Sequence, residues 1–306
     1  MAYSNTTGQT TINVDQLISY AFRDAGKTAE EMTPEYIGAA KQALFYNLQN
    51  LSNRGVNLWT IEQGQIVMNT GQSMYPIPSD TIDLLDTVTR TGSGETQSDV
   101  TVSRISEPTY MSIPNKNATG RPVQVWVNRQ TGLVNSTTVT LDGAINSTDT
   151  TITVSDASQL ATVGFINIGT ETIAYQNVSG NQLLNCFRGQ NNTTAAAHTA
   201  GATVTYQNLP SITVWPTPDN AQQYQFVYWR MRRTQDAGGG VNVMDVPFRF
   251  IPCMIAGLAY YLGGKSSDLQ RLPILKAQYD ESWEMAAGED REKAPDRLVP
   301  RMITYR

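Results

Sequence analysis

The stretch from 246 to 264, VPFRFIPCMIAGLAYYLGG, is the most apolar run of the chain and constrains its fold more than any other. Its apolar residues recur at the spacing of a helix that is buried over a broad face. They are Phe250, Ile251, Met254, Ile255, Leu258, Ala259 and Leu262. Asp245 is expected to cap the start, and Gly263–Gly264 to end the helix in the left-handed conformation. The run is too short for a membrane span, which needs about 20 apolar residues. We therefore predict the central helix of a soluble helical core.

The other strongly helical patterns lie toward the two ends of the chain. One apolar stripe runs from Val14 to Ala25, and a second helix is expected to start with Thr33 as N-cap and Pro34 at its first position. A last helix is predicted over 269–287, with Pro273 in its first turn. The core is therefore expected to gather helices from both ends, so that a long β-rich middle loops out between them.

Alternating apolar residues mark the strands of that middle region. The run 61–68, a turn at Asn69–Gly71 and a short strand at 74–77 predict a β-hairpin, and a further strand is expected at 82–88. Three more strands are predicted at 121–129, 209–216 and 223–233.

The interval between two of these strands differs in composition. Residues 132–208 are rich in threonine, and short alternating runs are separated by turns about every ten residues, as in small sandwiches and barrels. The charged residues of the interval are Asp142, Asp149, Asp156, Glu171 and Arg188. Without the interval, a hairpin-sized link would join the strands at 121–129 and 209–216. We predict an α+β fold with three parts. They are a helical core with β-strands over 1–131 and 209–288, an inserted all-β domain over 132–208, and an extended arm over 289–306.

Composition excludes several classes of function. The net charge of −5 argues against a protein that grips nucleic acid by neutralising many phosphates. Two cysteines, Cys186 and Cys253, placed in different predicted domains, do not support a disulfide framework. The start of the chain, MAYSNTTGQTT, lacks the basic and then apolar pattern of a signal peptide. We therefore expect assembly in a cytoplasm.

Known catalytic patterns are missing from the sequence. It has no Walker loop, HExxH, CxxC or G-x-S-x-G motif. A Ser–His, Cys–His or metal mechanism would have to use the single histidine, His198, whose ordinary interpretation is a turn residue or a local hydrogen bond. Glu62, Asp80 and Asp83 could supply a glycosidase-like carboxylate pair, with solvated surface charge as the alternative. The glycines at 238–240 indicate a hinge. We predict no catalytic residue, cofactor or metal site.

The last residues, EDREKAPDRLVPRMITYR, are broken by two prolines and become basic toward the end. The basic residues are Arg291, Lys293, Arg297, Arg301 and Arg306. This composition is typical of an arm that docks on a neighbouring protein, and a disordered terminus is the alternative.

The order of these elements resembles the head-to-tail adaptor proteins of short-tailed bacteriophages. The resemblance rests on two amphipathic helices, the motifs W-x-I-x-x-G (59–64) and N-T-G-x-x-x-Y-x-I-P (69–78), the strand pair, and the helices near the end of the chain. Within the interval, residues 155–204 resemble β modules of phage structural proteins.

The resemblance implies a virion protein of the neck, a homo-oligomeric ring of twelve subunits in that family. The ring would sit under the portal protein, with the arm 289–306 on the portal and the tail nozzle below. DNA would pass through without specific binding, and no membrane is involved. Two alternatives stay open: a tail-associated module whose β insert contacts a tail fibre or a host glycan, and a peptidoglycan hydrolase.

Overall fold

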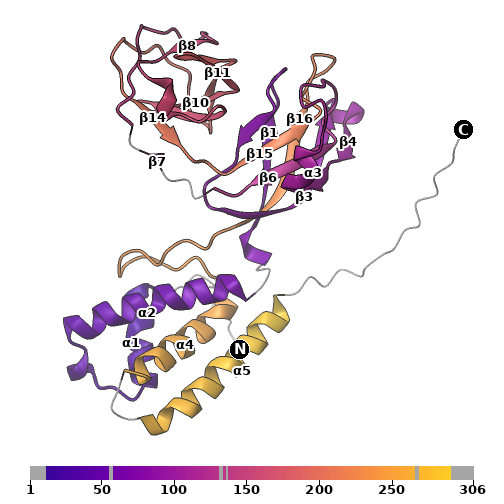
Figure 1. The fold of residues 1–306 in the computed structure, drawn as a ribbon. Helices are drawn as coiled ribbons and strands as arrows, with labels where there is room; N and C mark the ends of the chain where they lie inside the picture. The colour runs from indigo at the N-terminus through magenta and orange to yellow at the C-terminus, as the bar shows by residue number, and fades with distance from the viewer. Residues whose placement is uncertain (1–11, 55–57, 131–133, 136, 266–268, 291–306) are drawn as a thin grey trace, which may run out of the picture. The chain divides into compact units, whose positions relative to one another are not determined.

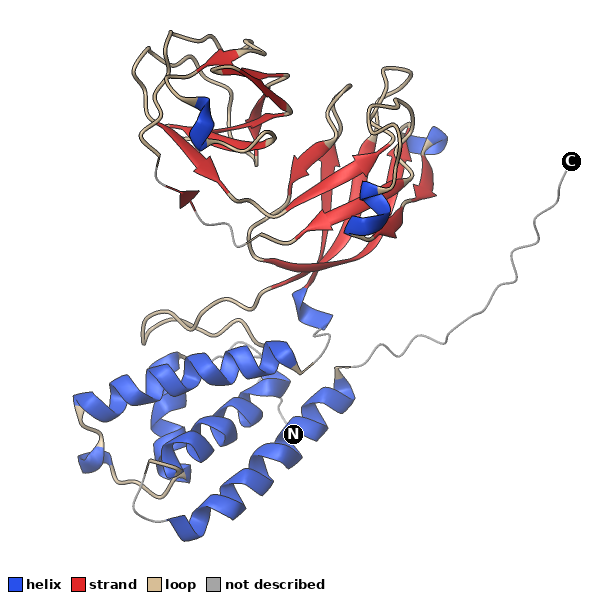
Figure 2. Ribbon diagram, viewed as in Figure 1, coloured by secondary structure: helices blue, strands red, loops and turns tan. Residues whose placement is uncertain are grey.

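The computed structural model describes residues 12–54, 58–130, 134–135, 137–265 and 269–290. The fold is α+β, as predicted, and the chain divides into two compact units (Figure 1). Unit 1 combines Met1–Thr60 with Arg233–Arg306, and unit 2 is Ile61–Arg232. The long helices belong to unit 1 and the sheets to unit 2 (Figure 2).

Unit 1 contains four long helices: α1 (Val14–Asp24), α2 (Pro34–Asn53), α4 (Ile251–Gly263) and α5 (Leu272–Glu289). Short 3-10 turns accompany them: η2 (Ala29–Glu31), η3 (Leu58–Thr60), η6 (Phe248–Phe250) and η7 (Leu269–Arg271). The predicted cap of α2 is confirmed, because the Thr33 side chain accepts a hydrogen bond from the Tyr36 backbone N–H and Pro34 opens the helix. Pro273 lies in the first turn of α5, as expected.

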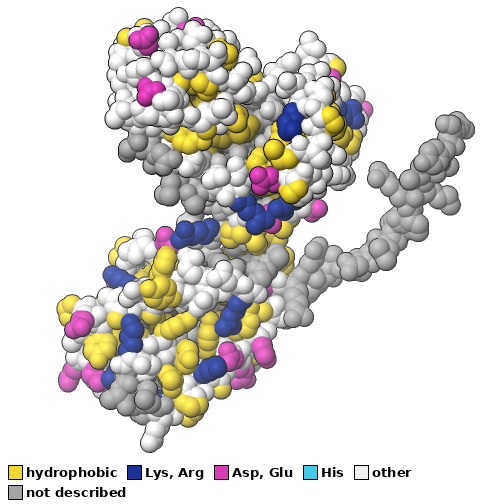
Figure 3. Space-filling model, in the orientation of Figure 1, with side chains coloured by type: hydrophobic (Ala, Val, Ile, Leu, Met, Phe, Trp, Pro, Cys, Tyr) yellow, Lys and Arg dark blue, Asp and Glu magenta, His cyan; other side chains and the backbone are white. Residues whose placement is uncertain are grey.

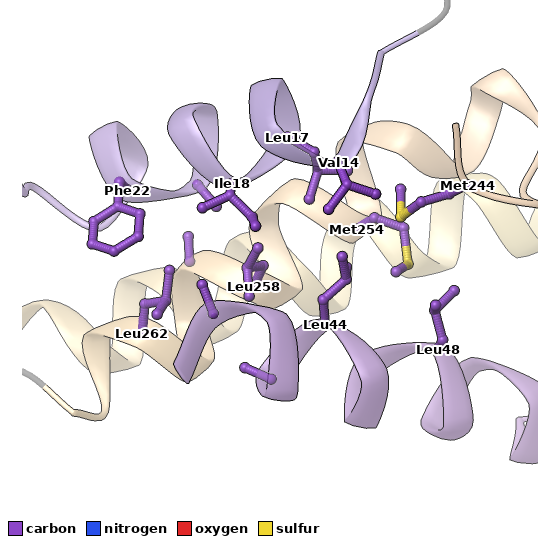
Figure 4. Close-up of a cluster of buried hydrophobic side chains, with 14 of the residues drawn as sticks. Val14, Leu17, Ile18, Phe22, Leu44, Leu48, Met244, Met254, Leu258 and Leu262 are labelled. Atoms are coloured by element: carbon purple, nitrogen blue, oxygen red, sulfur yellow. The ribbon is translucent and has the colours of Figure 1, made fainter. Parts of the chain in front are cut away.

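One hydrophobic core joins the four helices. Side chains of α1, α2 and α4 point toward one another, and Met244 joins them (Figure 4). The labelled residues are Val14, Leu17, Ile18, Phe22, Leu44, Leu48, Met254, Leu258 and Leu262, while α5 adds Leu275 and Ala286. Helix α4 contacts each of the other three helices.

Both predicted ends of the central helix are wrong in detail. Asp245 does not cap α4, since the helix begins at Ile251 after η6, and the Asp245 carboxylate instead accepts from the Gln235 backbone N–H at 3.1 Å. Pro252 explains the later start, because proline fits the first turn of a helix and no later. At the other end, Gly264 has a right-handed φ of −65°. Gly263 serves close packing instead, because a Cβ there would lie 2.7 Å from the Leu275 side chain.

Unit 2 contains two four-stranded sheets that share a core. The first has the order β1-β16-β3-β4 and the second β2-β15-β6-β5. Their bounds are β1 Ile61–Val67, β16 Gln225–Arg232, β3 Thr81–Thr91, β4 Ser98–Thr101, β2 Met74–Pro76, β15 Ser211–Trp215, β6 Gln124–Asn128 and β5 Ser103–Ile105, with helix α3 at Glu107–Met111 and the turn η4 at Gly94–Thr96. Neighbouring strands are antiparallel except for β5 and β6.

The predicted β-hairpin of 61–77 is wrong, because β1 and β2 lie in different sheets. Strand β1 pairs with β16, whereas β2 pairs with β15. The buried Tyr75 side chain stabilises the turn between them, because its hydroxyl donates to the carbonyls of Asn69 and Gln72, at 3.2 and 2.9 Å. This turn therefore carries the chain from one sheet to the other.

The interval 132–208 forms two further sheets, β13-β10-β9-β14-β7 and β11-β12-β8, with a core of their own. The bounds are β7 Val134–Asn135, β8 Ile152–Thr153, β9 Gly164–Ile168, β10 Glu171–Tyr175, β11 Asn177–Ser179, β12 Gln182–Leu184, β13 Phe187–Gln190 and β14 Val204–Gln207, with η5 at Ala157–Gln159. Ser211 pairs with Asn128 across β15 and β6. The strand before the interval and the strand after it are therefore paired neighbours in one sheet. The domain boundaries predicted within unit 2 stay a prediction.

Candidate functional site

A groove of about 740 Å³ runs along unit 1 where α1, α4 and α5 meet. Its lining is mostly apolar with a few charged residues. The residues are Ile12, Tyr20, Arg23, Asp24, Ile251, Pro252, Ile255, Ala256, Arg271, Ile274, Leu275, Gln278 and Ser282.

The groove exists because α4 is apolar on all sides but is covered on only some of them. Its sequence, IPCMIAGLAYYLG, has no charged residue, a composition typical of a helix that is buried all round. Ile251, Ile255 and Ala256 are nevertheless only half-buried within unit 1. On the neighbouring helix, Ile274 is 61% exposed. The chain itself therefore leaves part of its most apolar helix open.

The polar rim of the groove is mainly basic. The Arg23 guanidinium lies 5.0 Å from the centre of the Tyr20 ring, a cation–π distance. Arg271 donates to the Asp24 carbonyl over 3.5 Å, and its side chain lies where a Cβ on Gly26 would be. Gly26 has φ +79°, so this position both needs the left-handed conformation and leaves room for Arg271.

The outward face of α2 contrasts with this rim and contributes nothing to the groove. Two neighbouring aromatic residues, Phe45 and Tyr46, are 40% and 50% exposed there. Glu35 on the same helix and Glu30 before it are exposed acidic residues. Hydrophobic side chains accordingly form surface patches over the helices of unit 1 (Figure 3). Unit 1 thus presents an apolar groove with a basic rim and, elsewhere, a pair of exposed aromatic residues on α2.

Sequence reasoning missed this groove, although signals were present. Tyr20 and Ile274 are apolar residues that fall off the buried stripes of their helices. Such off-stripe residues are the pattern by which the open face could have been found.

His198 belongs to a buried ion cluster in unit 2. Its Nε2 lies 2.8 Å from the Glu171 carboxylate, which also accepts from Arg188 Nε and Nη2 at 2.9 and 2.8 Å. The backbone N–H groups of Gly189 and Ala196 donate to the same carboxylate. Burial alone would raise the pKa of Glu171, but these hydrogen bonds outweigh it and lower the pKa to about 2. The histidine therefore takes part in a network of hydrogen bonds, with a partner 27 positions away where the sequence suggested a local one.

The three candidate carboxylates are all engaged by arginines. Glu62 and Asp80 both pair with Arg230, and Glu62 also with Arg232. Asp83 pairs with Arg104 and Arg129. The structure therefore brings Glu62 and Asp80 together, but both carboxylates bind the guanidinium of Arg230.

Both cysteines are free and buried, as the sequence indicated. Burial raises the pKa of the Cys186 thiol to about 12 and that of Cys253 to about 11. Within the described ranges, no group of three or more His, Cys, Asp or Glu side chains could hold a metal ion. The same ranges include no helix with the length and apolarity of a membrane span.

The glycine-rich segment predicted as a hinge packs on the first turn of α1. The Asp15 backbone N–H donates to the Gly240 carbonyl at 3.0 Å, and a Cβ on Gly240 would collide with the Asp15 carboxylate. The predicted docking residues lie outside the described residues: Arg291, Lys293, Arg297, Arg301 and Arg306.

Compared with models of known protein families and with curated protein sequences, the chain matches none.

Proposed function

We propose that this chain is a structural virion protein that forms a ring between a phage portal and its tail. The observation that carries the proposal is the apolar helix α4, which is left partly open in the groove of unit 1. An apolar face of this kind on a single chain marks an interaction surface. In the proposal, the helices from both chain ends act as one bundle, and a second copy of the chain covers the groove.

The pairing of an apolar groove with exposed aromatic residues on another helix favours a second copy as the occupant of the groove. The groove is apolar with Arg23 and Arg271 on its rim, whereas the outward face of α2 offers the exposed aromatic side chains of Phe45 and Tyr46. The two surfaces are complementary in kind and lie on different helices. Such heterologous contacts generate rings when the rotation closes.

The remaining parts of the proposal follow from charge and from the resemblance. An acidic chain with net charge −5 suits the wall of a DNA conduit, because it offers few cations for phosphates to bind. The basic residues at 291–306 are proposed to dock on the portal protein, and the opposite side of the ring on the tail nozzle. The proposal assigns no catalytic step to the chain.

The test uses two substitutions on the same helix with nearly equal exposure. Ile274 lines the groove and is 61% exposed, whereas Met285 is 63% exposed and does not line it. The chain is co-expressed with the portal protein of the same genome, and native mass spectrometry counts the copies in the complex. We expect a multimeric complex for the wild type and for Met285→Glu, and its loss for Ile274→Glu.

Two results would contradict the proposal. In one, the wild-type chain stays monomeric and does not associate with the portal protein. In the other, Ile274→Glu and Met285→Glu assemble equally well, which would remove the groove from the contact. Thermal melts of both variants, expected to match the wild type, show that loss of assembly is not loss of fold.

A further inference from the structure

A second hollow lies inside unit 2, where the interval 132–208 meets the sheet β2-β15-β6-β5. Its volume is about 240 Å³. Side-chain contacts join its two sides: Met74 of β2 packs with Phe165 of β9 and with Leu209, and the side chains of Gln72 and Gln190 are hydrogen-bonded at 2.9 Å. We call this hollow the seam cleft.

The seam cleft combines aromatic rings with neutral hydrogen-bonding groups. Its aromatic residues are Tyr110, Trp126, Phe165 and Tyr206, and its amides and hydroxyls come from Ser73, Asn128, Gln130, Gln207, Asn208, Ser211 and Thr213. No charged side chain is among the described residues that line it. A phosphate or carboxylate ligand would find no counter-charge here, so the lining favours an uncharged molecule.

The flat apolar walls are well fixed. The rings of Tyr110 and Trp126 stack at 5.6 Å between centres and 16° between planes. Gly164 lets the Tyr206 ring lie close over β9, because a Cβ there would come within 2.8 Å of it. Burial raises the pKa of the Tyr110 and Tyr206 phenols, so both hydroxyls remain donors at neutral pH.

One lining group points to a ligand directly. Gln207 lies opposite Phe165 on the paired strands β14 and β9. The Gln207 Oε1 atom is buried and accepts no hydrogen bond from the described residues. A buried acceptor without a donor costs about 1–3 kcal/mol, and most such groups in proteins have a partner. If the Gln207 side chain turns toward the cleft that it lines, a donor on a bound molecule would remove that cost.

We propose that the seam cleft binds one neutral sugar ring of a glycan. A pyranose has an apolar face of C–H groups for aromatic walls and hydroxyl donors around its edge for amide oxygens such as Gln207 Oε1. The volume suits a single ring, since pockets for drug-sized ligands span roughly 300–1,000 Å³. This role goes beyond the proposed ring and does not depend on it.

The experiment measures sugar binding to the full chain by saturation-transfer NMR and titration. The probes are methyl β-glucopyranoside, methyl β-galactopyranoside and N-acetylglucosamine. We expect saturable binding of at least one, with a Kd of about 1 mM. Gln207→Leu should weaken it by about fivefold or more, because the acceptor is removed.

Gln176→Leu is the matched control. Gln176 also has a buried amide atom, Nε2, without a partner among the described residues, but it does not line the cleft. Its substitution should leave the Kd unchanged, and Trp126→Leu should weaken binding as Gln207→Leu does. If Trp126→Leu lowers the melting temperature, the Gln207→Leu result decides.

The proposal is overturned if none of the three sugars binds at tens of millimolar. It is equally overturned if Gln207→Leu and Gln176→Leu bind alike, because the sugar would then lie elsewhere.

Discussion

The helical core of unit 1 and the β interval of unit 2 are stabilised in different ways. The core of unit 1 gathers apolar side chains from α1, α2, α4 and α5. The interval also has an apolar core, and it buries the Glu171 carboxylate together with Arg188 and His198, whereas the buried Asp290 of unit 1 pairs with Arg249, whose side chain is 35% exposed. Burial of apolar surface is non-directional, whereas a buried ion pair stabilises only one arrangement of its partners.

The two regions also differ in the sequence separation of their contacts. Glu171 binds residues only 17 and 27 positions away. In unit 1, the Tyr279 hydroxyl donates to the Asn47 side chain 232 positions away, at 3.0 Å. Regions rich in local contacts form faster than those that depend on distant pairings. We therefore predict that the interval can form by itself, whereas unit 1 needs both ends of the chain.

The largest expected effect comes from Leu258→Asp in the middle of α4. Leu258 is fully buried, so the substitution removes its packing, worth about 2–5 kcal/mol, and buries an unpaired charge for several more. The sum approaches a typical total stability of about 5–15 kcal/mol. Hydrogen exchange with mass spectrometry should show unit 1 unfolded and peptides of 164–190 still protected.

The control for that prediction is Met285→Asp on α5, whose side chain is 63% exposed and should tolerate the charge. If Leu258→Asp also unfolds the interval, the two regions are not independent and the comparison fails. If Leu258→Asp leaves unit 1 protected, α4 is not its centre.

Helical stripes and strand alternation were sufficient to predict most elements. The stripe Val14–Ala25 became α1, and the paired strands around the interval were found because each alternates in isolation. The prediction of a hairpin over 61–77 was wrong because alternation identifies a strand but not its partner. Here the turn that is fixed by the Tyr75 hydroxyl leads the chain into a second sheet. The prediction that Asp245 caps the helix was wrong because Pro252 must lie in the first turn, so the helix begins at Ile251.

The candidate sites were harder to predict because each depends on distant residues. The groove needs Tyr20 of α1 and Ile274 of α5, which are 254 positions apart and belong to two helices that both contact α4. His198 could be recognised as a single histidine, but its partner Glu171 is one of several acidic residues and only the strand pairing brings them together. Nothing in the sequence distinguishes Gln207 from other glutamines. What distinguishes it is a buried side-chain oxygen that accepts no hydrogen bond from the described residues.

A smaller effect is expected from Glu171→Gln. The substitution leaves Arg188, whose side chain is 7% exposed, without its counter-charge, and breaking a buried pair in this way costs about 3–5 kcal/mol. Urea unfolding followed by hydrogen exchange in 164–190 should report that loss, with unit 1 unaffected. Asp99→Asn is the control, because it breaks a similar two-bond pair with Arg90 at the surface and should change stability little. Equal losses of stability in the two variants would show that the buried ion pair stabilises the protein no more than the surface pair does.

The smallest expected effect is the part of the acid sensitivity that comes from Glu171, whose charge is removed at low pH. The pKa of Glu171 is about 2 in the folded state and therefore lies below the ordinary value of 4.5. The charged Glu171 side chain accordingly contributes its full stability at pH values above about 4.5. As the pH falls from about 4.5 toward 2, the unfolded chain binds a proton before the folded one does, and that stability is lost. Urea midpoints of unit 2 should therefore decrease over this window in the wild type. In Glu171→Gln the decrease should be shallower, since the group that titrates is gone. Parallel pH profiles for the two proteins would place the acid sensitivity of the interval in other carboxylates.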